Sequence, residues 1–236
     1  MVRAFTLAEV LITLGIIGVV AAMTMPALIA EHREKQYIVS LKKSYSLFSQ
    51  LYIQALSEYG PPEDWMLYGP NNYIGSKNWF NKMFDKKIKI AALCDGISGC
   101  FPNKPYQSLR GGNNISPYED RNMIKFVLVD GTFVGIKSYS INCTAQKNGN
   151  MCGNLYVDIN GAKKPNKFGV DFFIFNLTKN GIVAPGFDGD KQDIFKKECN
   201  LTSGGGSGCT AWVLLNENMD YLRCNDLDWN TKTKCK

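Results

Sequence analysis

The stretch from residue 5 to residue 29 constrains the fold of this chain more than any other part. Glu9 is its only charged side chain, and most of the others are apolar. A helix of about twenty apolar residues spans the roughly 30 Å hydrocarbon core of a bilayer. The stretch therefore predicts one membrane-spanning helix, and the 236-residue chain is long enough to add one globular domain.

Glu9 narrows the interpretation of this helix. A lone carboxylate in lipid is costly, so an acidic residue inside a membrane segment is expected to have a partner and a function. A cleaved secretory signal does not fit, because its apolar core is shorter and a small-residue cleavage site follows it. A plain single-pass anchor explains the length of the stretch, but it explains neither Glu9 nor Pro26.

The N-terminal residues instead resemble a known signal. A short basic leader, MVRA, is followed by Phe-Thr-Leu-x-Glu, a long apolar run and a proline near its end. This order resembles the class III signal of type IV prepilins and of the pseudopilins of type II secretion. The resemblance divides the chain into a leader (residues 1–4), the transmembrane half of a long helix (5–29), its amphipathic half (30–59) and a globular domain (60–236).

The resemblance also implies a processing site and an assembly site. Prepilins are cleaved on the cytoplasmic side by a membrane-bound aspartic prepilin peptidase and are then N-methylated. Here the cleavage falls between Ala4, where the family usually has glycine, and Phe5, which receives the methyl group. Glu9 matches the glutamate that neutralises the N-terminal amine of a neighbouring subunit, and this pairing offsets part of the cost of two charges in lipid.

Three further positions bear on assembly. The small residues Gly15 and Gly18 would allow neighbouring helices to approach closely in lipid. Pro26 lacks a backbone donor and crowds the preceding turn, so a kink or break is expected there. In fibres of this family, that proline marks a place where the helix can loosen.

Beyond Pro26 the helix is expected to continue to residue 59 as an amphipathic helix. Apolar residues recur there at spacings of three and four, which places them on one face. Gly60-Pro61-Pro62 should end the helix, because glycine can take a left-handed cap and proline cannot continue. The apolar face consists of Ile38, Leu41, Tyr45, Phe48, Tyr52, Ala55 and Tyr59.

The C-terminal half predicts an antiparallel sheet. Two β-rich runs within residues 123–137 flank Asp130-Gly131, which indicates a two-residue type I′ hairpin turn. Residues 155–159 and 171–177 are expected to form further strands, the second ended by Asn180-Gly181. A long helix whose apolar face covers such a sheet is an α+β, pilin-like fold.

The rest of the globular domain is expected to be irregular. Between residues 61 and 118 the sequence predicts only a short helix at about 77–84, and beyond Gly186 it predicts loops. The glycine run from Ser203 to Gly208 is interpreted as a flexible loop tip, because it lacks the Lys-Ser/Thr of a phosphate-binding loop.

The segment from residue 158 to 171 carries a second, less specific resemblance. Its pattern D-x-N-G, P-N and G-x-D-x-F resembles a segment of the globular domains of prepilin-like proteins. Its oxygen-bearing side chains suit calcium, but Asp and Asn beside Gly are also ordinary turn formers. The turn interpretation is favoured for both oxygen-rich loops, which carry Asp158, Asn160 and Asp171, and Asp188, Asp190 and Asp193.

All eight cysteines lie in the C-terminal region, which indicates oxidation outside the cytoplasm. They fall into four close pairs, so four local disulfides are expected among the 105 connectivities that eight cysteines allow. Zinc binding is disfavoured, because it needs closely spaced thiolates in a reducing or zinc-rich setting. The expected pairs are Cys94–Cys100, Cys143–Cys152, Cys199–Cys209 and Cys224–Cys235.

The charges flanking the apolar stretch argue against an orientation with the C-terminal region outside the cytoplasm. Arg3 is the only basic residue before the stretch, whereas Arg33, Lys35, Lys42 and Lys43 follow it. The positive-inside rule would then place the C-terminal side in the cytoplasm. The cysteines and the prepilin resemblance both require export, and we give them the greater weight.

The sequence contains no constellation typical of an enzyme. His32, the only histidine, lies at the membrane edge, so no Ser-His or Cys-His pair can form in the globular domain. No H-E-x-x-H or C-x-x-C motif is present. A hydrolase with two catalytic carboxylates has no such sequence motif, so that class stays open, but no residue points to it. Aromatic residues interleaved with Lys82, Lys86, Lys87 and Lys89 could bind nucleic acid, but a net charge of +6 without a basic cluster disfavours that role.

We therefore expect a non-enzymatic, prepilin-like subunit of the bacterial inner membrane with its C-terminal domain in the periplasm. Its expected partners are other pilin-like subunits, prepilin peptidase and an inner-membrane assembly platform. Two alternatives stay open: an adhesive or DNA-uptake minor pilin, and a single-pass anchored binding protein that does not polymerise. Because tip pseudopilins often lack the acid at this position, Glu9 argues against a tip subunit.

Overall fold

The computed structural model describes residues 6–65, 73–96, 98–112, 114–139, 141–144, 150–187 and 191–235. The chain falls into two compact units, Met1–Gln36 and Tyr37–Lys236. One 53-residue helix, α1 (Leu7–Tyr59), contributes to both.

Helix α1 contains Pro26 and is not interrupted there. The break that proline predicts is therefore absent, because a full break would leave more backbone groups unpaired than the single bond that proline removes. At the other end, Gly60 has a φ of 74° and its N–H donates to Leu56 O at 3.1 Å. This left-handed glycine ends the helix as the sequence predicts.

In the second unit, α1 buries the apolar face that its periodicity predicts, with two exceptions. Tyr45 is half-buried and stacks on Phe175, with ring centroids 5.6 Å apart. Tyr59 is 43% exposed and lies against the Lys82 ammonium, 4.2 Å from its ring centroid. The buried residues of the helix are Tyr37, Ile38, Leu41, Ser44, Phe48, Leu51, Tyr52 and Ala55.

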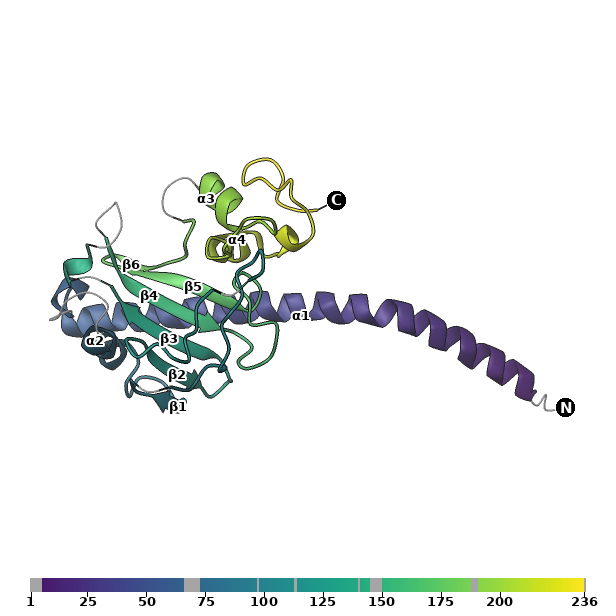
Figure 1. Cartoon of the computed structure of the whole chain (residues 1–236), viewed down its shortest axis with the longest axis horizontal. Coiled ribbons are helices and arrows are strands. Elements are labelled where there is room, and N and C mark those ends of the chain that lie inside the picture. The colour runs from purple at the N-terminus through teal and green to yellow at the C-terminus, as the bar shows by residue number, and fades with distance from the viewer. Residues whose placement is uncertain are drawn as a thin grey trace. The chain divides into compact units, whose positions relative to one another are not determined.

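The sheet is a six-stranded antiparallel meander in which strands adjacent in sequence are adjacent in space. Figure 1 shows the second half of α1 running behind it. The strands are β1 (Ile90–Cys94), β2 (Ile124–Leu128), β3 (Phe133–Ser138), β4 (Met151–Asp158), β5 (Phe172–Thr178) and β6 (Gly181–Val183).

Both faces of the sheet are buried along β2 to β5, whereas β1 is exposed or half-buried. Helix α2 (Tyr73–Met83) packs with α1 on one face, where Trp79 and Phe80 join the main core. The loop after β1 covers the other face, where Phe101 and Tyr106 belong to a smaller aromatic cluster. All eight residues of β4 are therefore buried, instead of alternating between core and solvent.

The hairpin between β2 and β3 differs from the prediction. Leu128 and Thr132 close it through a bond from Leu128 N–H to Thr132 O at 2.9 Å, so the loop has three residues. Of Asp130 and Gly131 only the glycine has a positive φ, whereas a type I′ turn needs both. The Asp130 carboxylate accepts the Thr132 N–H at 3.1 Å, and the Gly131 N–H donates to Leu128 O at 2.9 Å. These bonds fix the three-residue loop in place of the two-residue turn.

The sequence did not predict β1, nor the helices α3 (Lys191–Glu198) and α4 (Cys209–Asn216). These elements are short, and they are fixed by tertiary contacts and two disulfides rather than by a long periodic pattern. The described residues also form 3₁₀ turns at Pro62–Trp65, Ile141–Cys143 and Asp220–Leu222.

The glycine run is not a flexible tip. Gly204 and Gly205 accept backbone bonds from Arg110 and Leu109 at 3.0 and 3.1 Å. A Cβ on Gly206, whose φ is 97°, would lie 2.7 Å from Phe168 O. The glycines are therefore required for close packing between two backbone segments.

Candidate assembly site

The first turn of α1 holds the carboxylate of Glu9 by local hydrogen bonds. Glu9 Oε2 accepts both the backbone N–H and the hydroxyl of Thr6, each at 2.8 Å. The Glu9 N–H donates back to Thr6 Oγ1 at 3.3 Å. This reciprocal arrangement is a capping box, which satisfies backbone donors that the start of a helix leaves unpaired.

The capping box changes the argument made for Glu9 from the sequence. Thr-x-x-Glu before an apolar run is a known helix-start pattern, and FTLAE contains it, but the sequence analysis did not use it. Glu9 therefore has a hydrogen-bond partner within its own helix. These bonds satisfy its Oε2 without a second molecule, but the neutral donors of Thr6 leave the charge of the carboxylate uncompensated.

The other polar side chains of the apolar stretch are satisfied in the same way. Thr13 donates its hydroxyl to Val10 O at 3.0 Å, and Thr24 donates to Val20 O at 3.0 Å. With Thr6 and Glu9 they are all the Thr, Ser, Asn, Gln and charged residues between positions 6 and 29. Since each uses the backbone of its own helix, the stretch meets the main polar requirement of a segment in lipid.

The apolar surface of this stretch is not covered by the chain. Among the described residues, α1 is the one helix long and apolar enough to cross a membrane, and its apolar window is 0% buried. A Cβ at Gly15 or at Gly18 would meet no atom within 4 Å. These two positions therefore leave room for a neighbouring helix to approach. Ala4 and Phe5 lie outside the described residues.

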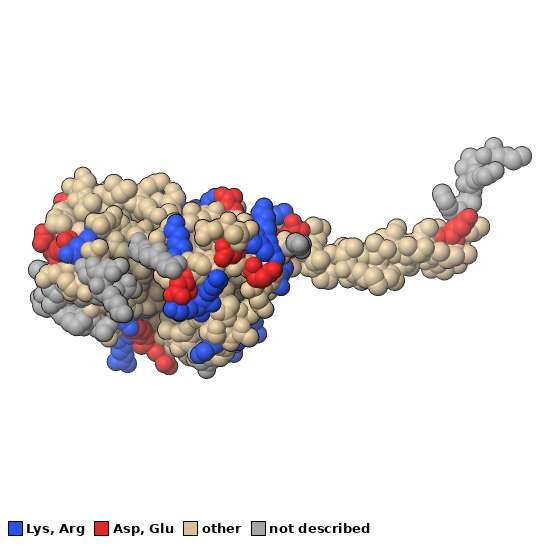
Figure 2. Space-filling view, turned by 90° about the horizontal axis from the view of Figure 1, so that it is seen from above, with Lys and Arg blue, Asp and Glu red and all other residues tan. Residues whose placement is uncertain are grey.

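After Glu9, the next charged residue is Glu31, just beyond the apolar stretch. Figure 2 shows most of the apolar helix in tan, without blue or red atoms along its middle. Glu31 and Lys35 form an ion pair at 2.7 Å, and Gln36 Nε2 lies 3.1 Å from His32 Nε2. His32 is thus part of an exposed helical surface, where no catalytic partner for it lies among the described residues.

The eight cysteines form four disulfides, and these are the local pairs expected from the sequence. Cys143–Cys152 and Cys199–Cys209 are buried, whereas Cys94–Cys100 and Cys224–Cys235 are partly exposed. They close loops across sequence separations of 6 to 11 residues. The pairs therefore fix the loops and chain ends of the globular unit.

The three side chains proposed for calcium lie together at the end of β4, where Asp158 is the last residue, and in the loop that leads to β5. Asp171 accepts the backbone N–H groups of Asn166 and Lys167 at 2.9 and 2.7 Å, and the Asn160 amide at 3.1 Å. Asp158 accepts the Asn160 N–H at 3.2 Å and the Tyr106 hydroxyl. Because both carboxylates face N–H and O–H donors, this arrangement fits the turn interpretation better than a cation site.

Burial dominates the electrostatics of this loop. Asp158 and Asp171 are both fully buried, and burial raises the pKa of Asp158 to about 8 although the Tyr106 hydroxyl opposes the shift. Burial also raises the pKa of Asp171. Of the other three acidic residues, Asp193 lies in α3 rather than in the predicted loop and pairs with Lys197 at 2.6 Å, whereas Asp188 and Asp190 lie outside the described residues.

Comparison with known proteins gives no relative: no family model, no curated protein and no solved structure matches the chain. The structure thus defines a class by its own features, namely a chain with one exposed apolar helix that could span a membrane and a disulfide-bonded α+β unit.

Proposed function

We propose that this chain is a structural subunit of a fibre assembled at the bacterial inner membrane, a type IV pilus or a type II secretion pseudopilus. Prepilin peptidase would cleave the chain after Ala4, and Phe5 would be N-methylated. The globular domain would lie in the periplasm before assembly. Its partners would be other pilin-like subunits and an inner-membrane assembly platform.

The observation that carries the proposal is the position of one carboxylate on an otherwise apolar, uncovered helix. Glu9 lies in the first turn of α1, and cleavage would place a new ammonium group at Phe5, one residue before Thr6. An ammonium and a carboxylate are each costly in lipid, so they favour pairing with each other. The open surfaces at Gly15 and Gly18 would let a second helix bring its own terminus within reach.

The capping box gives this pairing a defined starting state. In the isolated chain Thr6 donates two hydrogen bonds to Glu9. A neighbour's ammonium would add charge compensation, which the neutral donors of Thr6 do not provide. In this proposal Thr6 orients the carboxylate before assembly, and the neighbouring subunit neutralises it.

The same capping box favours a second candidate, a single-pass anchored binding protein. A glutamate whose Oε2 accepts two hydrogen bonds from its own helix needs no role beyond starting that helix. In that case Glu9 would act through its hydrogen bonds, and its charge would have no role.

Replacing Glu9 by glutamine separates the two functions. Glutamine retains the capping interaction but carries no charge. If the chain is a fibre subunit, the amount of the Glu9→Gln chain in fibres should fall at least about ten-fold. The reason is that an ammonium left unpaired in a dry interface costs about 2–5 kcal/mol. The matched control is Glu31→Gln, which removes an exposed charge just outside the apolar stretch and should assemble normally.

The measurement is the amount of subunit in sheared fibres from cells that also make prepilin peptidase and an assembly platform, with the N-terminal mass determined in parallel. We expect wild-type chains that begin at N-methylated Phe5, and a loss of fibres in Glu9→Gln with normal cleavage. Wild-type chains that still begin at Met1, or full assembly of the Glu9→Gln chain, would favour the anchored binding protein.

A further inference from the structure

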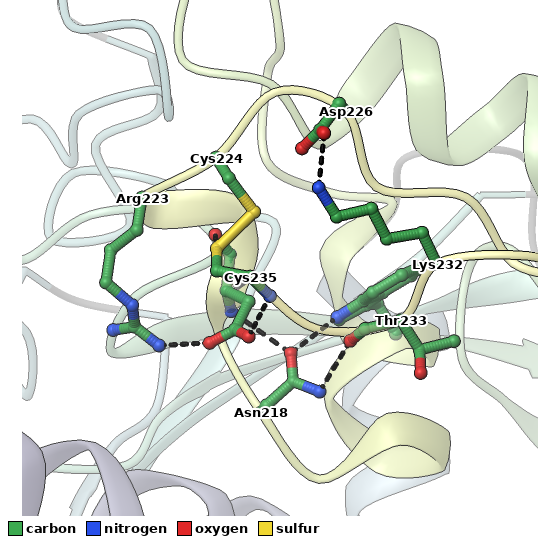
Figure 3. Close-up of a disulfide and its surroundings, with 9 residues drawn as sticks. Asn218, Arg223, Cys224, Asp226, Lys232, Thr233 and Cys235 are labelled. Atoms are coloured by element: carbon green, nitrogen blue, oxygen red, sulfur yellow. Dashed lines mark hydrogen bonds and ion pairs between the residues drawn. A yellow bond between two sulfur atoms is a disulfide. The ribbon is translucent and has the colours of Figure 1, made fainter.

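A twelve-residue strap at the C-terminus, residues 224–235, is fixed at both of its ends. The Cys224–Cys235 disulfide joins these ends (Figure 3). Asp220 holds the same two residues, because its backbone O accepts the Cys224 N–H at 3.0 Å and its Oδ2 accepts the Cys235 N–H at 2.7 Å. The strap is therefore a closed loop with a defined position against the residues before it.

The middle of the strap packs onto the aromatic residues of α3 and α4. The Trp229 ring lies 4.9 Å from that of Trp212 and 6.1 Å from that of Phe195. The backbone N–H of Trp229 donates to Gln192 Oε1 at 2.8 Å. Near the end of the strap, Thr233 O accepts the side-chain amide of Asn218 at 3.0 Å (Figure 3).

Between α3 and the first residues of the strap lies a cavity of about 170 Å³. Its apolar lining comes from Phe195, Tyr221 and Leu227, and Cys199 and Cys224 of two disulfides also line it. For comparison, an engineered apolar cavity of about 150 Å³ in another protein binds benzene. The cavity is therefore large enough for one six-membered ring.

Two hydrogen-bond donors at the cavity have capacity for a ligand. Lys196 has a side chain that is 62% exposed, and its Nζ lies 3.9 Å from Asp228, the long limit for an ion pair. The exposed Asn225 makes no side-chain hydrogen bond within the part of the chain that the structure describes. Asn200, by contrast, is used internally, since its Oδ1 accepts the Ser203 N–H at 2.7 Å.

We propose that this cavity binds a small aromatic carboxylate, with the ring between Phe195, Tyr221 and Leu227 and the carboxylate at Lys196 and Asn225. The ring would displace water from an apolar surface, which favours binding. The carboxylate would stay at the open side, where it receives charge-assisted hydrogen bonds and loses little hydration. This site is independent of the proposed role in a fibre, because it lies in the C-terminal region and uses no residue of α1.

The test uses the full chain in lipid nanodiscs, with 4-fluorobenzoate as the probe and ligand-observed ¹⁹F NMR as the measurement. Unlabelled benzoate should displace the probe to saturation, with a dissociation constant on the order of 1–10 mM for a ligand of about nine non-hydrogen atoms. Benzyl alcohol, a neutral analogue, should bind about two- to five-fold more weakly, which is the usual effect of an exposed ion pair. Empty nanodiscs correct for partition of the probe into lipid.

Two pairs of variants locate the site. Lys196→Met should remove the preference for benzoate over benzyl alcohol, whereas Lys197→Met, on the same helix, should retain it. Opening the strap with Cys224→Ser and Cys235→Ser removes one wall and should weaken both ligands, whereas Cys94→Ser and Cys100→Ser should not.

Leu227→Trp provides a volume test, because the larger side chain should fill the cavity and abolish binding of both ligands. Its thermal unfolding shows whether it is folded, and Lys196→Met tests the site even if it is not. The proposal is overturned if the wild-type chain shows no saturable displacement. It is also overturned if Lys196→Met keeps the full preference for benzoate, or if a folded Leu227→Trp chain binds as the wild type does.

Discussion

The apolar half of α1 and the globular unit satisfy their polar groups over very different distances along the chain. In the helix, Thr6, Thr13 and Thr24 use partners three or four residues away. In the globular unit, the Tyr52 hydroxyl donates to the carbonyl of Thr178, 126 residues away, and the Asn160 amide donates to Tyr37 Oη, 123 residues away. The first region can therefore form its helix before any tertiary contact exists, whereas the second depends on the complete domain.

The two regions also differ in how their apolar side chains are covered. Val19 and Leu28 in the helix are 57% and 68% exposed, whereas Phe126 in β2 is fully buried among rings of α2 and the turn after it. Apolar surface left open in a folded chain indicates a second molecule or a membrane as its cover. Packing should therefore determine stability in the globular unit only.

The largest expected effect is the contrast between these two kinds of apolar residue. Phe126→Ala removes a ring that lies 5.2 Å from Phe80 and 5.0 Å from Phe84, and it should lower the free energy of unfolding by about 3–5 kcal/mol. Val19→Ala removes methyl groups that touch no core residue, and it should leave the stability of the domain unchanged. Urea titration of the chain in nanodiscs, followed by tryptophan fluorescence, measures both. Equal losses would contradict the separation of the two regions.

The second effect is a pH dependence that belongs to the globular unit. The folded pKa of Asp158, about 8, is above the value near 4 of an unfolded chain, so the folded state retains a proton that the unfolded state releases. The stabilising contribution of this proton is complete below pH 4 and is lost as the pH rises through 8, with a slope of at most about 1.4 kcal/mol per unit. Asp171, whose pKa burial also raises, adds to this slope.

Asp158→Asn should remove most of this pH dependence, because the amide does not titrate and can still accept the hydrogen bond from Tyr106. Urea midpoints measured between pH 5 and pH 8 provide the comparison. A matched control is Asp193→Asn, since this exposed carboxylate forms an ion pair with the exposed Lys197. An Asp158→Asn curve as steep as that of the wild type would assign the dependence to other groups.

The smallest effect concerns the start of α1. Thr6→Val removes one of the two donors to Glu9 and the acceptor of the Glu9 N–H, which should cost about 0.5–2 kcal/mol locally. Amide hydrogen exchange of the first turn should increase, while the urea midpoint of the domain stays constant. Thr13→Val serves as the control, because the Thr13 hydroxyl donates to the backbone carbonyl of Val10 and takes no part in the capping box. A shift of the urea midpoint would show that the helix start and the domain are coupled.

The predictions from the sequence agree best with the structure where they rest on residues close together along the chain. The face of α1 and the four disulfide pairs follow from short spacings, and the structure contains both. The prediction of a two-residue turn at Asp130-Gly131 was wrong, although it also rests on neighbouring residues. The reason is that the Asp130 side chain competes for the Thr132 N–H. The capping box at Thr6 and Glu9 was available from the spacing alone and was missed.

By itself, the sequence determines the apolar helix, its single acid and the loops that the cysteines close, because each depends on residues close together along the chain. Only the tertiary structure decides that Asp158 and Asp171 are buried, that the glycine run supports the backbone of Arg110, and that a strap borders a cavity. Those features join segments far apart in sequence. Their free energies depend on burial and on distances that no local pattern contains.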